Sequence, residues 1–127
     1  MVADETGEVN VAEDKLGAVR IAPQVLTTIA QLTTLAVPGV VQMSGDVPGG
    51  LDRWLRGQGH RDGVRIAVVD DAVSVDVYVV AEKNVNLYDL GQEIQSAVAR
   101  AIKDIVGMPV LSVTVHIEDV RITAPGA

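Results

Sequence analysis

The most regular hydrophobic pattern in the chain covers residues 64–80, VRIAVVDDAVSVDVYVV, where apolar and polar positions alternate on both sides of Asp70 and Asp71. A period of two is typical of β-strands, because successive side chains point to opposite faces of a sheet. A two-residue turn at the aspartates satisfies both faces of a hairpin at once. The predicted pairs are Val68 with Val73, Ile66 with Val75, Val64 with Val77 and, on the other face, Arg65 with Asp76.

The residues before the hairpin predict a strand, a helix and a second strand. GAVRIA at 17–22 is a short strand, and Pro23 suits the first position of a helix because no hydrogen bond is lost there. Apolar residues then recur at i, i+4, i+7 and i+11 until Pro38 and Gly39 end the helix. The predicted buried stripe consists of Val25, Ile29, Leu32 and Ala36. VVQM at 40–43 follows as a strand.

A second helix is predicted after the hairpin. Asn86 can cap its first turn, Asp89 lies near the positive end of its dipole, and Gly107 followed by Pro109 ends it. Its outer face is polar and charged. The predicted buried stripe is Leu87, Leu90, Ile94, Val98, Ala101, Ile102 and Ile105.

The last predicted strand, LSVTVHIEDVRI, changes phase near its end. Its inward positions are Leu111, Val113, Val115 and Ile117, after which Val120 and Ile122 are shifted by one residue. A bulge at Glu118 and Asp119 accounts for the shift. The elements predict an α+β fold with two helices packed on one face of a small, largely antiparallel sheet, in the order β-α-β-β-β-α-β.

Length and composition predict a single domain with an aliphatic core. The chain has 127 residues, 48% of them hydrophobic, with one Trp, two Tyr and no Phe, so Val, Ile, Leu and Ala must fill the interior. Residues 1–14 hold five of the seventeen acids and no base, which is typical of a disordered acidic tail. We therefore expect a domain over 15–123 and a short flexible C-terminus at 124–127.

The formal charge of −7 makes nucleic acid and anionic lipid unfavourable main partners, since both attract clustered Lys and Arg. The absence of Cys excludes disulfides and thiol catalysis, and it fits a reducing compartment. No apolar run reaches the roughly 20 residues of a membrane span, and the N-terminus does not resemble a signal peptide. The expected location of the bare chain is the cytoplasm.

Motifs that would indicate catalysis or a cofactor are weak. His60 and His116 have no second ligand at metal-binding spacing, and no serine lies in a nucleophile elbow. Asp70 and Asp71 are adjacent carboxylates, but a hairpin turn explains them better than a catalytic dyad. The sequence predicts no catalytic residue, no metal and no cofactor.

The stretch GGLDRWLRGQGHRDG at 49–63 contains the only tryptophan of the chain and three arginines. Its glycines lack the GK[ST] ending of a phosphate loop, and a hairpin follows them rather than a helix. Leu51, Trp54 and Leu55 have the spacing of one helical turn, which favours a segment that caps the fold. The alternative is a protein-contact surface, because Trp and Arg dominate binding hot spots. The candidate contact residues are Leu51, Arg53, Trp54, Leu55, Arg56 and Arg61.

The sequence resembles the alkaline shock protein 23 and Gls-type envelope stress response proteins of bacteria from about Gly17 to Ile122. The resemblance is carried by GAVRIAPQVLTTIA followed by PGVV, by the hairpin entry at Gly63 and Val64, by NLYDLGQEIQSAVARAI, and by GMPVLSVTVHIEDV. One departure is Thr114, which stands where the family usually has Asn.

The resemblance implies a non-enzymatic scaffold or protein-interaction protein of the bacterial cell-envelope stress response and homeostasis. It implies protein partners, either a small integral-membrane anchor or further copies of the chain, and no direct membrane insertion. It places the protein in the cytoplasm or, through a partner, at the inner face of the membrane. The alternatives are a regulatory module that binds an enzyme of fatty-acid or lipid synthesis, and a small RNA-binding module, which the acidity disfavours.

Overall fold

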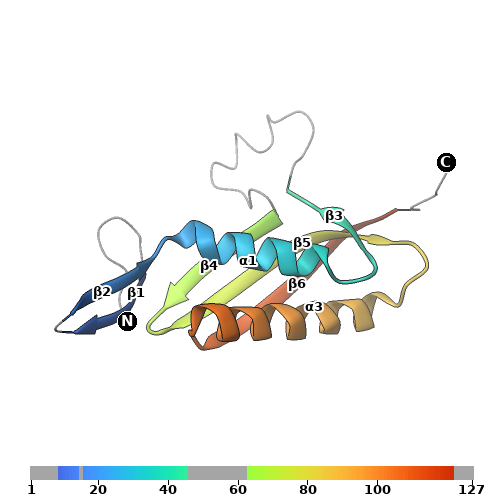
Figure 1. Ribbon diagram of the computed structural model, residues 1–127. Helices are drawn as coiled ribbons and strands as arrows, with labels where there is room; N and C mark the ends of the chain where they lie inside the picture. Colours follow the sequence, from blue (N-terminus) through green and yellow to red (C-terminus); the bar gives the residue numbers. More distant parts are fainter. Residues whose placement is uncertain (1–8, 15, 46–62, 122–127) are drawn as a thin grey trace.

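The computed structural model describes residues 9–14, 16–45 and 63–121 (Figure 1). The elements follow one another as β1 (Val9–Asp14), β2 (Gly17–Ile21), α1 (Pro23–Leu35), β3 (Val40–Met43), β4 (Val64–Val69), β5 (Ala72–Glu82), α3 (Leu87–Ala101) with a π-helical turn at Ile102–Val106, and β6 (Val110–Arg121). From β2 onward this is the predicted order, and the α+β fold is confirmed.

β5 is the central strand of a four-stranded sheet. β4 and β3 pair with successive parts of one edge of β5, both antiparallel, and β6 pairs with the other edge. The β4–β5 register is the predicted one, including Arg65 opposite Asp76. The predicted bulge is confirmed as well, because the β5–β6 register shifts between Ile117 and Asp119 and passes over Glu118.

The pairing of β6 with β5 is parallel, which the strand patterns did not reveal. β5, α3 and β6 form a strand–helix–strand unit, in which the helix carries the chain back to the end of the sheet where β5 began. A crossover of this kind makes the two strands run in the same direction. The sheet is therefore mostly antiparallel, with one parallel pair at its β6 edge.

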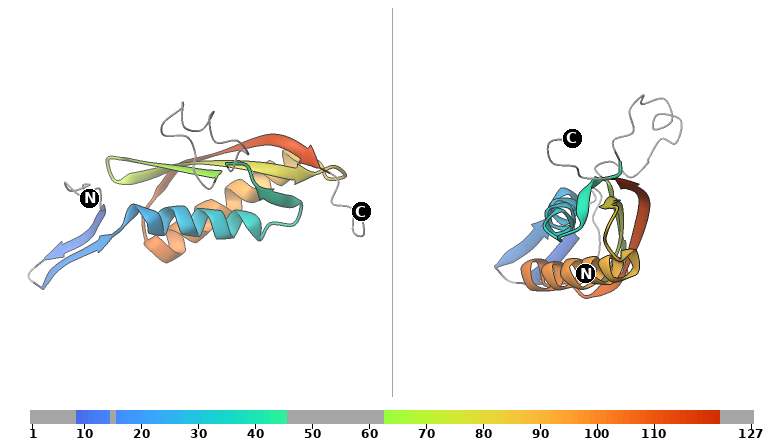
Figure 2. Two further views of the ribbon diagram at one scale, coloured as in Figure 1. Left: turned by 90° about the horizontal axis from the view of Figure 1, so that it is seen from above. Right: turned by 90° about the vertical axis from the view of Figure 1, so that its right-hand side faces the viewer.

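Both helices cover the same face of the sheet, with α1 under β3 and β4 and α3 under β5 and β6 (Figures 1 and 2). Alternate residues of β5 point into the layer between sheet and helices and are fully buried: Val73, Val75, Val77 and Val79. They meet Leu26 and Ala30 of α1 and Ile94 and Val98 of α3. The core is aliphatic, as the composition predicted.

The rotation of α1 differs from the prediction. Leu26, Ala30 and Thr34 are fully buried, whereas Val25 and Leu32, which the predicted stripe placed inside, are 43% and 62% exposed. Both sets have helical spacing, and α1 has no charged residue to mark its outer side. Packing against the sheet, rather than the local pattern, decides which set is buried.

The ends of α3 agree with the prediction. The Asn86 side chain accepts a hydrogen bond of 3.0 Å from the backbone N–H of Asp89, as a helix cap does. Gly107 ends the helical segment with a φ of 82°, a left-handed conformation that favours glycine. Two positions of the predicted stripe differ, since Leu87 is 37% and Ile105 68% exposed.

β1 and β2 form a separate two-stranded sheet, the β1–β2 arm, which projects beyond the N-terminal end of α1 (Figures 1 and 2). Residues 9–14 thus form a strand, although their acidity led us to expect a disordered tail. Antiparallel pairing with β2 satisfies the backbone groups of this segment, and composition alone does not reveal such a pairing. Residues 1–8 and 122–127 lie outside the described residues.

Candidate protein-binding surfaces

The outer side of α1 is an exposed apolar row. Leu32 is 62%, Val25 43% and Leu35 40% exposed, and Ile29 lies half-buried between them. These positions follow the spacing of one helical face, and the side chains around them are threonines and glutamines. We call Val25, Ile29, Leu32 and Leu35 the α1 row.

The α1 row differs in charge from the rest of the molecule. The helix PQVLTTIAQLTTL contains no Asp, Glu, Lys or Arg, in a chain with a formal charge of −7. Surface helices normally keep charged residues toward water. Depletion of charge around exposed apolar residues is instead typical of the centre of a protein–protein interface.

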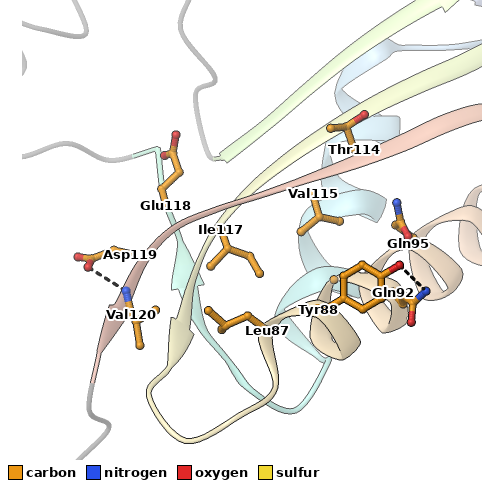
Figure 3. Close-up of a pocket in the computed structure, with 11 residues that line it drawn as sticks. Leu87, Tyr88, Gln92, Gln95, Thr114, Val115, Ile117, Glu118, Asp119 and Val120 are labelled. Carbon is orange, nitrogen blue, oxygen red and sulfur yellow. Dashed lines mark hydrogen bonds between the residues drawn. The ribbon is translucent and has the colours of Figure 1, made fainter.

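A second surface is a groove between the first half of α3 and the second half of β6 (Figure 3). It encloses about 880 Å³. Figure 3 shows Leu87 and Ile117 facing each other from the two elements, with Tyr88 and Val115 further along. Tyr88 is 75% exposed, and its hydroxyl accepts a 3.5 Å hydrogen bond from Gln92 Nε2. We call this space the α3–β6 groove.

The groove runs along a strand edge. Among the described residues β6 pairs with β5 alone, so its outer edge has no neighbouring strand. Gln95 Nε2 donates a 3.0 Å hydrogen bond to the backbone oxygen of Val113 and fixes one end of the groove. At Gly91, which lines the groove on its α3 side, an added Cβ would meet no atom within 4 Å. The groove thus has unfilled space beside its helix.

The acidic end of the groove is formed by Glu118 and Asp119. Glu118 Oε1 accepts a 2.7 Å hydrogen bond from the Ser44 hydroxyl, and Asp119 Oδ1 accepts one of 2.8 Å from the backbone N–H of Val120. Asp119 also lies 3.7 Å from Arg121 Nε. The bulge turns these residues out of the regular alternation, and the Glu118 side chain points away from the apolar space between Leu87 and Ile117 (Figure 3).

The opposite face of the sheet carries His116, which the sequence predicted to be a surface histidine. Its Nε2 lies 2.9 Å from Asp76 Oδ1, and its ring stacks on Tyr78 with a centroid distance of 4.3 Å. The parallel β5–β6 pairing creates this contact, so no local pattern could indicate it. Among the residues that the structure describes, no three His, Cys, Asp or Glu side chains are placed to hold a metal ion.

The residues predicted to contact a partner lie outside the described residues. They are Leu51, Arg53, Trp54, Leu55, Arg56 and Arg61, and the same holds for His60. Their role stays a prediction. Sequence reasoning did not identify the α1 row as a binding surface. The absence of charged residues from the whole predicted helix was a signal that could have indicated it. The groove had no such signal, because α3 and β6 meet only in the folded chain.

In the described parts of the chain, none of the helices combines the length and the apolar character needed to span a membrane.

Comparison with known proteins agrees with the sequence resemblance. A model of the alkaline shock protein 23 family, described as having a cell envelope-related function, matches residues 11–122. The uncharacterized protein YqhY of Bacillus subtilis (strain 168) is 26% identical over 106 residues, which cover 84% of this chain and 78% of YqhY. The uncharacterized protein YloU of the same strain is 23% identical over 113 residues, 87% of this chain and 94% of YloU.

Among solved structures, the copper form of the MamM CTD superposes with a TM-score of 0.55 and 14% sequence identity, over 81% of this chain and 91% of that one. At this identity the likeness shows a shared fold.

Proposed function

Because the chain belongs to the alkaline shock protein 23 family, whose function is related to the cell envelope, we propose that it is a non-enzymatic scaffold that acts by self-association through the α1 row. The observation that carries this proposal is the charge-free helix α1, which exposes Val25, Leu32 and Leu35 in an acidic protein.

A second copy of the chain is the partner that suits the α1 row best. The row has no charge to pair with, so it favours an equally uncharged surface. Elsewhere the net negative charge makes two copies repel each other. Two α1 helices that pack antiparallel across a twofold axis would bury both rows against each other. The flanking threonine and glutamine side chains can exchange hydrogen bonds without desolvating a charge.

Contact with the envelope is proposed to go through a protein anchor. Anionic lipid surfaces attract clusters of Lys and Arg, whereas this chain has seven more acids than bases. A small integral-membrane protein is therefore the partner proposed to hold the scaffold at the inner face of the membrane.

The test is the substitution Leu32→Glu. Leu32 is 62% exposed and lies near the middle of the row, so the folded monomer should be retained while two like charges meet at the twofold axis. Sedimentation velocity over a concentration series should show the dimer of the parent chain weakened at least about tenfold, or about 1.4 kcal/mol. Ser96→Glu adds the same charge to the exposed face of α3 and should leave the dimer unchanged.

A parent chain that stays monomeric at high concentration would contradict the proposal. Equal effects of Leu32→Glu and Ser96→Glu would also contradict it, because the effect would then follow from net charge rather than from the α1 row.

A further inference from the structure

The outer edge of β6, where it borders the α3–β6 groove, is a surface that the α1 row does not explain. We propose that this edge binds a short extended segment of a basic partner protein, which adds to β6 as one more strand and places an apolar side chain in the groove. The inference goes beyond the proposed self-association and does not depend on it.

The hydrogen bonds of β5 show which main-chain groups of β6 face outward. The backbone N–H of Val73 donates a 2.9 Å hydrogen bond to the Pro109 oxygen, so every second residue of β5 from Val73 onward is directed at β6. Val77 is one of them, and its register partner in the parallel pair is Val115. A residue in a parallel pair bonds to the two neighbours of its register partner. The N–H and C=O of Val115, and likewise of Ile117, therefore point away from β5.

Gln95 agrees with this direction and marks one end of the free edge. Its Nε2 donates a 3.0 Å hydrogen bond to the oxygen of Val113, so α3 already supplies a donor to that outward carbonyl. At the other end, the bulge at Glu118 breaks the regular alternation. Between these points, the outward groups of Val115 and Ile117 have no hydrogen-bond partner among the described residues. The free edge is short and is centred on these two residues.

The free edge selects an extended chain as its occupant, because the main chain of an added strand matches unpaired strand groups. Side chains of the added strand next to Val115 and Ile117 would lie on the helix side of the sheet, beside Leu87 and the unfilled space at Gly91 (Figure 3). The intervening side chains would lie beside Thr114, on the opposite face. The edge therefore suits a segment in which apolar and polar residues alternate.

Charge favours a basic partner over a second copy. None of the described residues that line the groove is Lys, Arg or His, and the whole chain has seven more acids than bases. Such a chain attracts a basic segment and repels an acidic one. A second copy has the same excess of acids. Its own β6 edge is also shortened by Gln95 and by the bulge, which leaves few main-chain groups for pairing between copies.

The test uses the full chain with Leu32→Glu, so that the α1 row does not join two copies. Short random peptides displayed on phage are selected against this chain, and a selected peptide is then synthesised. The selected sequences should alternate apolar with polar or basic residues and should avoid acids. Gly91→Phe adds a side chain where an added Cβ meets no atom within 4 Å, and it should weaken binding at least about tenfold. Gly91→Ala is its control and should bind as before.

N-methylation of the peptide distinguishes strand addition from the filling of an apolar space, and it leaves the protein unchanged. A methyl group on a main-chain nitrogen that faces β6 removes a donor and should weaken binding at least about tenfold. Methylation of the adjacent nitrogen, which points away from β6, should have little effect. In the protein, amide hydrogen exchange at Val115 and Ile117 should slow when the unmodified peptide binds.

Four results would overturn the inference. They are a selection that enriches no peptide, equal binding by the Gly91→Phe and Gly91→Ala variants, equal effects of the two N-methylations, and unchanged hydrogen exchange at Val115 and Ile117. Self-association of the Leu32→Glu chain that Gly91→Phe abolishes would also overturn it, because the occupant of the groove would then be a second copy. None of these results bears on the α1 dimer, which is measured with Leu32 intact.

Discussion

α1 and α3 cover the same face of the sheet, yet their outer sides are opposite in character. α3 carries Glu93, Arg100 and other polar residues toward water, and its polar and apolar residues lie on separate sides. α1 has no charged residue and exposes Leu32 and Val25. The two helices contribute to the same core, so the difference between them concerns what each presents to other molecules.

The local signals of the two helices differ in the same way. α3 begins at a capping Asn86, has Asp89 in its first turn and Arg100 in its last turn, which suits the helix dipole at both ends. The cap residue of α1 is Ala22, which makes no side-chain hydrogen bond, and its ends have no charge. α3 is thus specified by its own sequence, whereas α1 depends on tertiary packing.

The largest expected effect is a difference in unfolding free energy between substitutions on the buried side and on the exposed side of α1. Leu26→Ala removes a fully buried side chain and should lower the free energy of unfolding by about 2–5 kcal/mol. Leu32→Ala makes the same change at the exposed row and should cost less than about 0.5 kcal/mol. Urea denaturation of both variants, at concentrations where the chain is monomeric, measures the difference.

A larger loss for Leu32→Ala than for Leu26→Ala would show that α1 is rotated toward the predicted stripe instead. The α1 row would then lie inside the fold, and the proposed dimer surface would be lost with it.

The rotation of α1 also shows how far the sequence could predict this fold. The β4–β5 register, the bulge at Glu118 and the cap at Asn86 were predictable, because each follows from neighbouring residues or from one alternating pattern. In α1 two stripes have helical spacing, and without charges nothing local distinguishes the buried one. The parallel pairing of β6 was not predictable either, because it is set by a crossover through α3.

The candidate surfaces were less predictable than the fold. The sequence drew attention to Trp54 and its neighbours, which lie outside the described residues. The α3–β6 groove joins Leu87 to Ile117, residues that are distant in the chain and unremarkable in composition. A surface of this kind exists only after the helix has docked on the sheet, so local patterns do not indicate it.

A smaller effect is expected at Thr34, because α1 buries a polar side chain in the core whereas the buried side chains of α3 are apolar. The Thr34 side chain is fully buried, and its Oγ1 has no hydrogen-bond partner among the described residues. An unsatisfied buried hydroxyl is destabilising, and valine has nearly the same shape without it. Thr34→Val should therefore raise the free energy of unfolding by about 1–2 kcal/mol, measured in urea.

Thr28→Val is the matched control for this prediction, because Thr28 is exposed on the same helix. It should change the free energy of unfolding by less than about 0.5 kcal/mol. A loss of stability in Thr34→Val would mean that the hydroxyl has a hydrogen-bond partner. The inner side of α1 would then be as well suited to the core as that of α3.

The smallest expected effect tests whether α3 is specified locally. Asn86→Ala removes the acceptor for the backbone N–H of Asp89 and should lower the free energy of unfolding by about 1 kcal/mol. Asn84→Ala makes the same change two residues earlier, in the exposed turn before the helix, and should have less than half that effect. Equal losses in the two variants would mean that tertiary packing holds the start of α3, as it holds α1. The contrast between the helices would then lie in their outer faces alone.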